Sequence, residues 1–117
     1  MPMHHHPLAQ THFKPALLAG DNVFLQDIYS SDKLDADKPI SAGFYRLEKG
    51  EQLVYTYGYH EMKIILEGEY QITDETGLSV TARPGDVFYF EKGATITFTT
   101  PDYGLAFYTG QRAMGVA

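Results

Sequence analysis

Hydrophobic and polar positions form short runs through most of the chain, from residue 22 to residue 110. The runs are rich in Val, Ile, Thr, Tyr and Phe, residue types that favour strands. They cover 22–29, 41–48, 52–59, 62–68, 69–74, 78–82, 86–91, 94–100 and 103–110. No long run keeps a helical period. The runs MKIIL and DVFYF are almost continuously apolar, so we expect both of their faces to be covered. The pattern predicts an all-β protein in which two antiparallel sheets face each other.

Turn residues separate the runs, in segments such as DETG and RPGD, where Gly, Pro or Asp allows the chain to reverse. The first 20 residues differ, because they mix three prolines with the run His4–His6 and a short LLAG segment. We therefore predict an irregular N-terminal arm over residues 1–20 and a single folded domain over residues 21–117.

Composition excludes several kinds of function. The chain has 117 residues, enough for one hydrophobic core, and a net charge of −6 with only nine Lys and Arg residues, which argues against nucleic-acid binding. It has no cysteine, so disulfides, thiolate metal sites and cysteine nucleophiles are excluded. No apolar stretch resembles a membrane span or a secretory signal. We expect a cytoplasmic protein with no membrane partner.

The stretch YTYGYHE places tyrosines at positions 55, 57 and 59 and a glutamate at position 61. Side chains on alternate strand residues point to the same face, and by this period Lys63 joins them. If that face is the inner one, the interior holds phenol groups, one carboxylate and one ammonium group. His60 should then point to the opposite face, unless a bulge at Gly58 reverses the order.

The spacing of glycines and of the glutamate resembles the cupin motifs. The first motif is matched by Gly50, Tyr55, Tyr57, Glu61 and Gly68, and the second by Gly85, the run Glu91–Gly93, Ile96 and Thr100. The runs LEGE and RPGDVFYFEKG make the chain most similar to the EutQ-like small cupins, the ethanolamine-utilisation protein Q family, over roughly residues 40–110. The resemblance implies a single-domain jelly-roll barrel over residues 21–117, an interior small-molecule pocket and a homodimer.

Metal-binding cupins hold a divalent ion at positions that correspond here to Tyr55, Tyr57, Glu61 and Ile96. Only Glu61 is a competent ligand at neutral pH, since a phenol must first lose its proton. We therefore expect no cofactor. The alternative is a divalent metal bound by Glu61, His60 and an atypical further ligand. Ile96 and Phe98 are expected to close the pocket where metal cupins have a ligand.

The interior face suggests acid–base chemistry. We predict Glu61, Lys63 and Tyr57 as catalytic residues, with the carboxylate or the amine moving a proton and tyrosine hydroxyls stabilising negative charge. Tyr55, Tyr59, Arg46, Tyr89 and Tyr108 are predicted to bind the substrate, and an inward Arg46 would favour an anion. The alternatives are a solvated Arg46 at the rim and simple core packing of Tyr89 and Tyr108. The alternative is that Glu61 and Lys63 form a structural ion pair among core tyrosines.

Three hypotheses for function follow. The first is a cupin that binds a small polar or anionic molecule and acts as a metal-independent lyase or isomerase. The second is a metal-dependent cupin enzyme with atypical ligands. The third is a non-catalytic ligand-binding or assembly module.

Overall fold

The computed structural model describes residues 1–117 and contains ten strands and one short helix, α1 (Ala9–His12). Apart from this helix, the regular structure is β, as the pattern of short runs predicts. The strands are β1 (Leu17–Ala19), β2 (Val23–Ser30), β3 (Ser41–Glu48), β4 (Leu53–Thr56), β5 (Glu61–Gly68), β6 (Tyr70–Thr73), β7 (Ser79–Ala82), β8 (Val87–Phe90), β9 (Thr95–Thr99) and β10 (Tyr103–Gly110).

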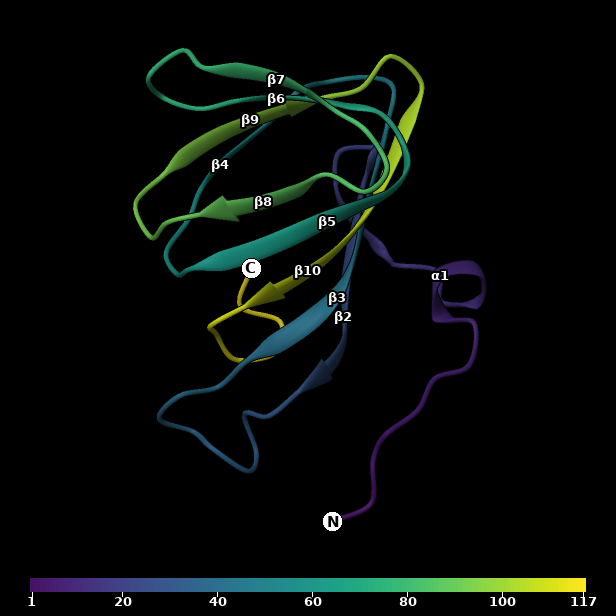
Figure 1. Cartoon of the computed structure of the whole chain (residues 1–117), viewed down its shortest axis with the longest axis vertical. Helices are drawn as coiled ribbons and strands as arrows, with labels where there is room; N and C mark the ends of the chain where they lie inside the picture. Colours follow the sequence, from purple (N-terminus) through teal and green to yellow (C-terminus); the bar gives the residue numbers. More distant parts are fainter.

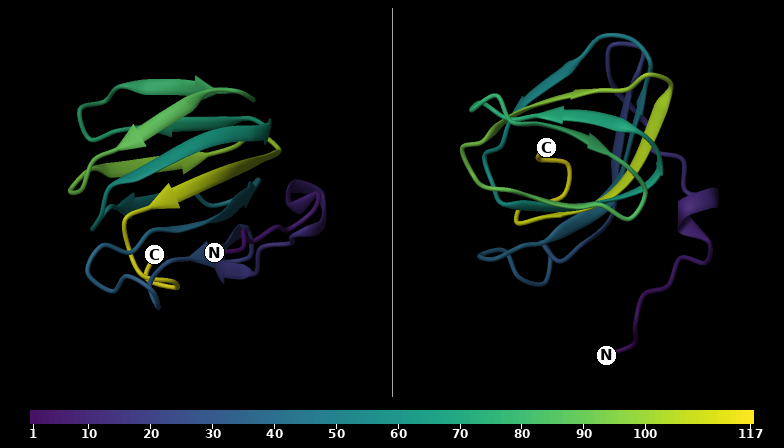
Figure 2. Two further views of the ribbon diagram at one scale, coloured as in Figure 1. Left: turned by 60° about the horizontal axis from the view of Figure 1, so that its bottom comes forward. Right: turned by 45° about the horizontal axis from the view of Figure 1, so that its top comes forward.

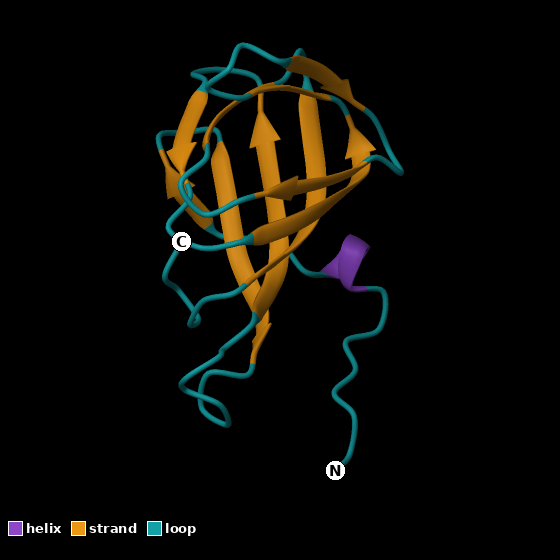
Figure 3. Cartoon of the chain, turned by 60° about the vertical axis from the view of Figure 1, so that its left-hand side comes forward, coloured by secondary structure: helices purple, strands orange, loops and turns teal.

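The strands form two antiparallel sheets that enclose a common interior (Figure 1). One sheet has the order β1-β2-β3-β10-β5-β8, and the other has the order β4-β9-β6-β7. From β3 onward the chain passes back and forth between the two sheets, and only β6 and β7 are consecutive partners in one sheet. This is the jelly-roll arrangement that the resemblance to cupins implies, and Figure 3 shows the strands curving around the interior.

Aromatic rings fill much of the core. Tyr45 from one sheet packs against Tyr70 and Phe98 from the other, with ring centroids 5.4 and 5.3 Å away. The Tyr70 hydroxyl donates a 2.8 Å hydrogen bond to the backbone oxygen of Tyr45, so the buried phenol is satisfied. Gly104 makes this packing possible, because a Cβ atom there would overlap the Tyr70 ring.

The segment predicted as an irregular arm contains some regular structure. Residues 17–19 form β1 at the edge of the larger sheet, and residues 9–12 form one helical turn. Residue 10 also touches the barrel, because the Gln10 amide donates a 3.0 Å hydrogen bond to Glu67. The remaining residues before β1 have no regular structure, and Figure 1 shows the N-terminus extending away from the barrel.

The two strongly apolar strands are covered on only one side, which differs from the expectation. Met62 of β5 and Val87 and Tyr89 of β8 are 55%, 71% and 53% exposed on the outer face of the larger sheet. Alternate residues Phe88 and Phe90 face inward and are partly or fully buried. The near-continuous apolar runs therefore reflect one core face and one apolar surface. No helix in the structure is long and apolar enough to cross a membrane.

Candidate functional site

The tyrosine-rich stretch lies with its alternate side chains inside the barrel, as the period of two predicts. Burial alternates from Tyr55 to Lys63: the odd-numbered residues are buried or half-buried and the even-numbered residues are exposed. The order continues through the connection between β4 and β5, so Gly58 does not reverse it. Glu61 and Lys63 are only 2% and 3% exposed.

Glu61 is the centre of a buried polar network. Its Oε2 atom accepts a 2.5 Å hydrogen bond from the Tyr57 hydroxyl and lies 3.2 Å from Nζ of Lys63. Tyr55 and Tyr59 are hydrogen-bonded to each other through their hydroxyls, at 3.2 Å. A buried carboxylate requires such partners, because an isolated charge in a dry interior is very costly. One acid, one amine and one phenol are therefore held together by contacts between their polar atoms.

Burial changes the protonation of these groups. Loss of water lowers the pKa of Lys63 below its usual value, and the nearby Glu61 carboxylate opposes this shift without cancelling it. Burial raises the pKa of Tyr57, and the Glu61 charge adds to the effect, so this phenol stays protonated and acts as a donor. Burial likewise raises the pKa of Tyr59. Burial thus favours the neutral form of the amine and of both phenols.

A small cavity of about 40 Å³ adjoins the network. Its lining combines the polar residues with apolar ones: Leu18, Leu25, Tyr45, Leu53, Tyr55, Tyr57, Tyr59, Glu61, Lys63, Phe98 and Ala117. The Tyr45 hydroxyl is buried and has no hydrogen-bond partner. An unpaired buried hydroxyl costs free energy until a ligand or water satisfies it. Tyr45 therefore gives the cavity a free polar group.

Tyr45 was missed as a site residue in the sequence. The alternation in β3 puts Tyr45 and Leu47 on one face and Arg46 and Glu48 on the other, but does not say which face is inside. The signal in the sequence was that one face carries two large apolar side chains, Tyr45 and Leu47. In the structure both residues are 1% exposed. Nζ of Lys63 lies 4.5 Å from the centre of the Tyr45 ring, a cation–π distance.

Residues 112–117, which follow β10, reach this cavity through Ala117, and Figure 2 (right) shows the C-terminal end lying across the opening of the barrel. Arg112 fixes the segment through two hydrogen bonds of 2.8 Å to Asp27 of β2. The Gly115 amide donates to the same carboxylate, also at 2.8 Å. The Tyr108 hydroxyl donates to it at 2.6 Å. Asp27 thus binds the segment to the barrel wall.

We call the contacts of Asp27 with Arg112, Tyr108 and Gly115 the clamp. The clamp also affects the protonation of the Asp27 carboxylate. Burial alone would raise the pKa of Asp27, but the hydrogen bonds from Arg112, Gly115 and Tyr108 outweigh burial and lower the pKa. Asp27 and Arg112 were not recognised in the sequence, because 84 residues lie between them and no local motif connects them. Tyr108, predicted to bind substrate, is buried with its hydroxyl committed to Asp27.

Two predicted substrate ligands lie outside the barrel cavity. Arg46 is on the outer face of β3, where its Nε atom donates a 3.0 Å hydrogen bond to Glu48 and its guanidinium stacks on the Tyr103 ring. Tyr89 is on the outer face of β8, and its hydroxyl is 2.9 Å from Nδ1 of His60. Both placements correct the prediction, and the reason is strand parity: Tyr45, Phe88 and Phe90 take the inward positions.

The metal positions of other cupins do not fit an ion in this chain. Ile96 has no donor atom, and the Tyr57 phenol is protonated and already bonded to Glu61. His60, the imidazole of the metal alternative, is exposed on the opposite face from Glu61 and accepts a hydrogen bond from the Lys92 amide. The two residues therefore cannot hold the same ion. No group of three or more His, Cys, Asp or Glu side chains in the structure is arranged to bind a metal.

The jelly-roll topology and the polar interior together define a cupin-type barrel. The chain matches the EutQ-like cupin domain over residues 34–103, more than half of its length, and it belongs to this family.

Comparisons with individual proteins agree with the family. The chain is 36% identical over 62 residues to acetate kinase EutQ of Salmonella typhimurium, a match that spans 53% of this chain and 26% of that protein. The crystal structure of the ethanolamine utilization protein EutQ from the same species has 31% identity and a TM-score of 0.65, covering 78% of this chain and 70% of that one. A protein of unknown function from Rhizobium leguminosarum shares the fold, with a TM-score of 0.72, 23% identity and coverage of 94% and 97%.

Proposed function

We propose that this EutQ-like cupin binds a small polar or anionic molecule in its barrel and transfers a proton on it without a metal, as a lyase or an isomerase does. The observation that carries the proposal is the contact of Lys63 and Glu61 beside the unpartnered Tyr45 hydroxyl. A lysine whose pKa is lowered by burial is neutral over a wider pH range than an exposed lysine, and the neutral amine is the form that acts as a general base.

The residues divide the chemistry between them. In its neutral form Lys63 accepts a proton from a carbon next to a carbonyl or carboxylate group of the substrate. The Tyr45 hydroxyl donates a hydrogen bond to the oxygen on which negative charge then develops. The Lys63 ammonium returns its proton to another carbon in an isomerase, or to the leaving group in a lyase. Glu61 holds Tyr57 and stabilises the ammonium form of Lys63.

Substrate entry requires movement of residues 112–117. The cavity of about 40 Å³ has room for only a few water molecules, whereas small-molecule pockets typically have about 300–1,000 Å³. Ala117 is the lining residue that belongs to the segment after β10, and the clamp at Asp27 holds this segment in place. We infer that the segment moves outward when a ligand binds, and that the Asp27 contacts set the free energy of that movement.

The test begins with a thermal-shift screen of small carboxylic acids and sugars, because a ligand of the folded state raises the melting temperature. Compounds that stabilise the protein are then incubated with it in deuterated water, and NMR follows exchange at carbon, isomerisation or elimination. Wild type should turn over at least one compound, and Lys63→Met should abolish turnover, both alone and combined with Glu61→Gln. The second change removes the buried carboxylate that Lys63→Met leaves without its partner, so the double variant should keep the fold. Lys49→Met, at an exposed turn, is the matched control and should be fully active.

Two outcomes would overturn the proposal. Turnover that survives in Lys63→Met shows that the amine is not the base. Binding without chemistry in wild type, with Glu61→Gln changing only affinity, identifies a non-catalytic ligand-binding module. The kinase activity in the name of the Salmonella relative is not extended to this chain, which covers 26% of that protein.

A further inference from the structure

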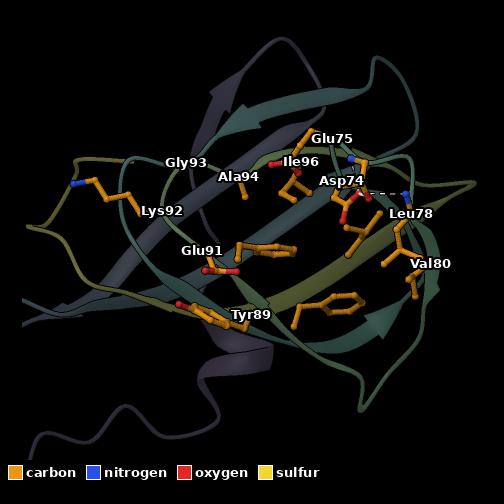
Figure 4. Close-up of a pocket in the computed structure, with 14 residues that line it drawn as sticks. Asp74, Glu75, Leu78, Val80, Tyr89, Glu91, Lys92, Gly93, Ala94 and Ile96 are labelled. Carbon is orange, nitrogen blue, oxygen red and sulfur yellow. Dashed lines mark hydrogen bonds between the residues drawn. The ribbon is translucent and has the colours of Figure 1, made fainter.

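A second, larger cavity of about 580 Å³ lies where the barrel is open, between β7 and β8. Each of these strands is an edge of its own sheet, so no backbone pairing joins them. Figure 4 shows the side chains that line this cavity, which we call the seam cavity. It is separate from the barrel cavity: Phe90 lines the seam cavity and Phe98 lines the barrel cavity, and their rings pack edge to face at 5.8 Å between the two.

The wall of the seam cavity is largely apolar. Phe88, Phe90 and Ile96 line it from β8 and β9, and Leu78 and Val80 line it from the other edge. Leu78 is 64% exposed, although it is a large aliphatic residue. Apolar side chains left uncovered around a concave surface are typical of a binding site. The seam cavity therefore suits a hydrocarbon body, and its volume is within the range of about 300–1,000 Å³ found for small-molecule pockets.

The charged groups around the seam cavity are mostly acidic. The Glu91 side chain makes no hydrogen bond, and Glu75 receives only a long one, 3.4 Å from the Thr95 amide. Asp74 is different, because its carboxylate is occupied by the Thr76 hydroxyl and the backbone amides of its own turn. Lys92 is the one cation in the lining, and Figure 4 shows its side chain pointing away from the cavity. Two carboxylates at an apolar cavity are thus free to pair with a ligand.

We propose that the seam cavity binds a small organic cation, an ammonium group carried on a hydrocarbon chain. The ammonium group pairs with Glu91 and Glu75, and the chain lies on the aliphatic and aromatic wall. The ring of Phe88, which is only partly buried, adds cation–π attraction for groups next to the charge. An anion of the same shape meets two like charges, and a neutral alcohol gains only the apolar contact.

The test is a titration of the isotope-labelled protein followed by amide NMR, with n-hexylammonium as the probe and hexanoate and n-hexanol as matched probes of equal chain length. Hexylammonium should give saturable shifts that map to β7, β8 and the turn before β9. Glu91→Gln and Glu75→Gln should each weaken its binding about fivefold, the size of one exposed ion pair, and the double variant should weaken it further. Hexanoate should produce no saturable shift.

Control variants test whether hexylammonium binding depends on these two carboxylates and on this cavity. Glu51→Gln removes an exposed carboxylate in the turn between β3 and β4, and should leave hexylammonium binding unchanged. Lys63→Met should also leave it unchanged, because the barrel cavity is a different site. The spectrum of each variant reports whether it is folded. The proposal is wrong if hexanol binds as tightly as hexylammonium, if the Glu51 and Glu91 variants lose affinity equally, or if the shifts map elsewhere.

Discussion

The Arg112 guanidinium donates two hydrogen bonds to the Asp27 carboxylate, each 2.8 Å long, and both side chains are under 5% exposed. The geometry is the bidentate one in which a guanidinium binds a carboxylate most strongly. Because Asp27 also accepts from Gly115, the pair fastens the segment that covers the barrel cavity. A buried ion pair thus connects the stability of the barrel to access to its interior.

Replacing Asp27 by Asn should destabilise the protein strongly. The change leaves the Arg112 charge buried without its partner, and loss of one member of a buried pair typically costs about 3–5 kcal/mol. Urea denaturation gives the free energy of unfolding. Arg83→Met is the control, since it removes an exposed ion pair of 3.8 Å with Glu69 and should cost about 1 kcal/mol or less. Equal effects of the two variants would show that the clamp is energetically unimportant.

The clamp also predicts a response to acid. The pKa of Asp27 is lower in the folded protein than the value of about 3.9 expected for the unfolded chain. Its contribution is therefore complete above the unfolded value and is lost as the pH falls through the folded one. Hydrogen exchange at Gly115 should quicken, relative to exchange in β10, as the pH is lowered below about 4. A constant ratio of the two exchange rates over that range would contradict this.

Much of the site was predictable because the period of a strand is local. Alternation alone placed Tyr57, Glu61 and Lys63 together, and the structure has them in one buried network. The period does not reveal which face of an isolated strand is inside, so it could not show that Arg46 and Tyr89, both predicted as substrate ligands, lie outside the barrel. In β3 and β8 the other face also carries large aromatic or aliphatic residues. Turning that face inward buries more apolar surface.

Contacts between distant segments could not be predicted in the same way. The Asp27–Arg112 pair joins two ends of the domain, and neither residue stands in a motif. The seam cavity depends on which strands become the sheet edges, a property of the whole topology. The resemblance to cupins predicts the barrel and its central pocket. It does not predict the contacts of residues 112–117, which only the structure shows.

Lys63 should give the protein a distinctive dependence on alkaline pH. Its pKa is lower in the folded protein than in the unfolded chain. At pH values between the folded pKa and about 10.4, Lys63 is therefore protonated in the unfolded chain and neutral in the folded protein. Stability contributed by this group therefore rises with pH in that window, by at most about 1.4 kcal/mol per pH unit. The reference is the double variant Lys63→Met, Glu61→Gln, which has the same tyrosines and no charge at positions 61 and 63. If the stability difference between the two proteins is constant from about pH 7 to about pH 9.5, the folded pKa lies above that range.

Gly104 should tolerate no side chain. A Cβ atom at this position in β10 overlaps the ring of Tyr70, whose hydroxyl is fixed to the backbone of Tyr45. Overpacking of this kind costs about 1–3 kcal/mol, so Gly104→Ala should lower the free energy of unfolding by that amount. Gly58→Ala is the matched control, because no atom lies within 4 Å of its Cβ position. It should be neutral or stabilising by up to about 1 kcal/mol. A similar loss in both variants would contradict the role of the Tyr70 contact.

The outer face of the larger sheet should be the contact surface of a homodimer. Phe107, Ile64 and Val87 are direct cross-strand neighbours and form an apolar row across β10, β5 and β8. Phe44 of β3 continues the row but is only 5% exposed, because Phe13 of the N-terminal segment packs on its ring. Met62 and Tyr89, paired in the next row, extend the row into a patch, and exposed patches of this kind typically mark interfaces. A second copy presents the same patch, so a twofold contact buries both.

Sedimentation velocity should detect a dimer, and Val87→Arg should convert it to a monomer without unfolding it. Val54→Arg changes a similarly exposed valine on the other sheet and should leave the dimer intact. A wild-type monomer at high micromolar concentration, or a dimer that survives Val87→Arg, would place the contact elsewhere or exclude it.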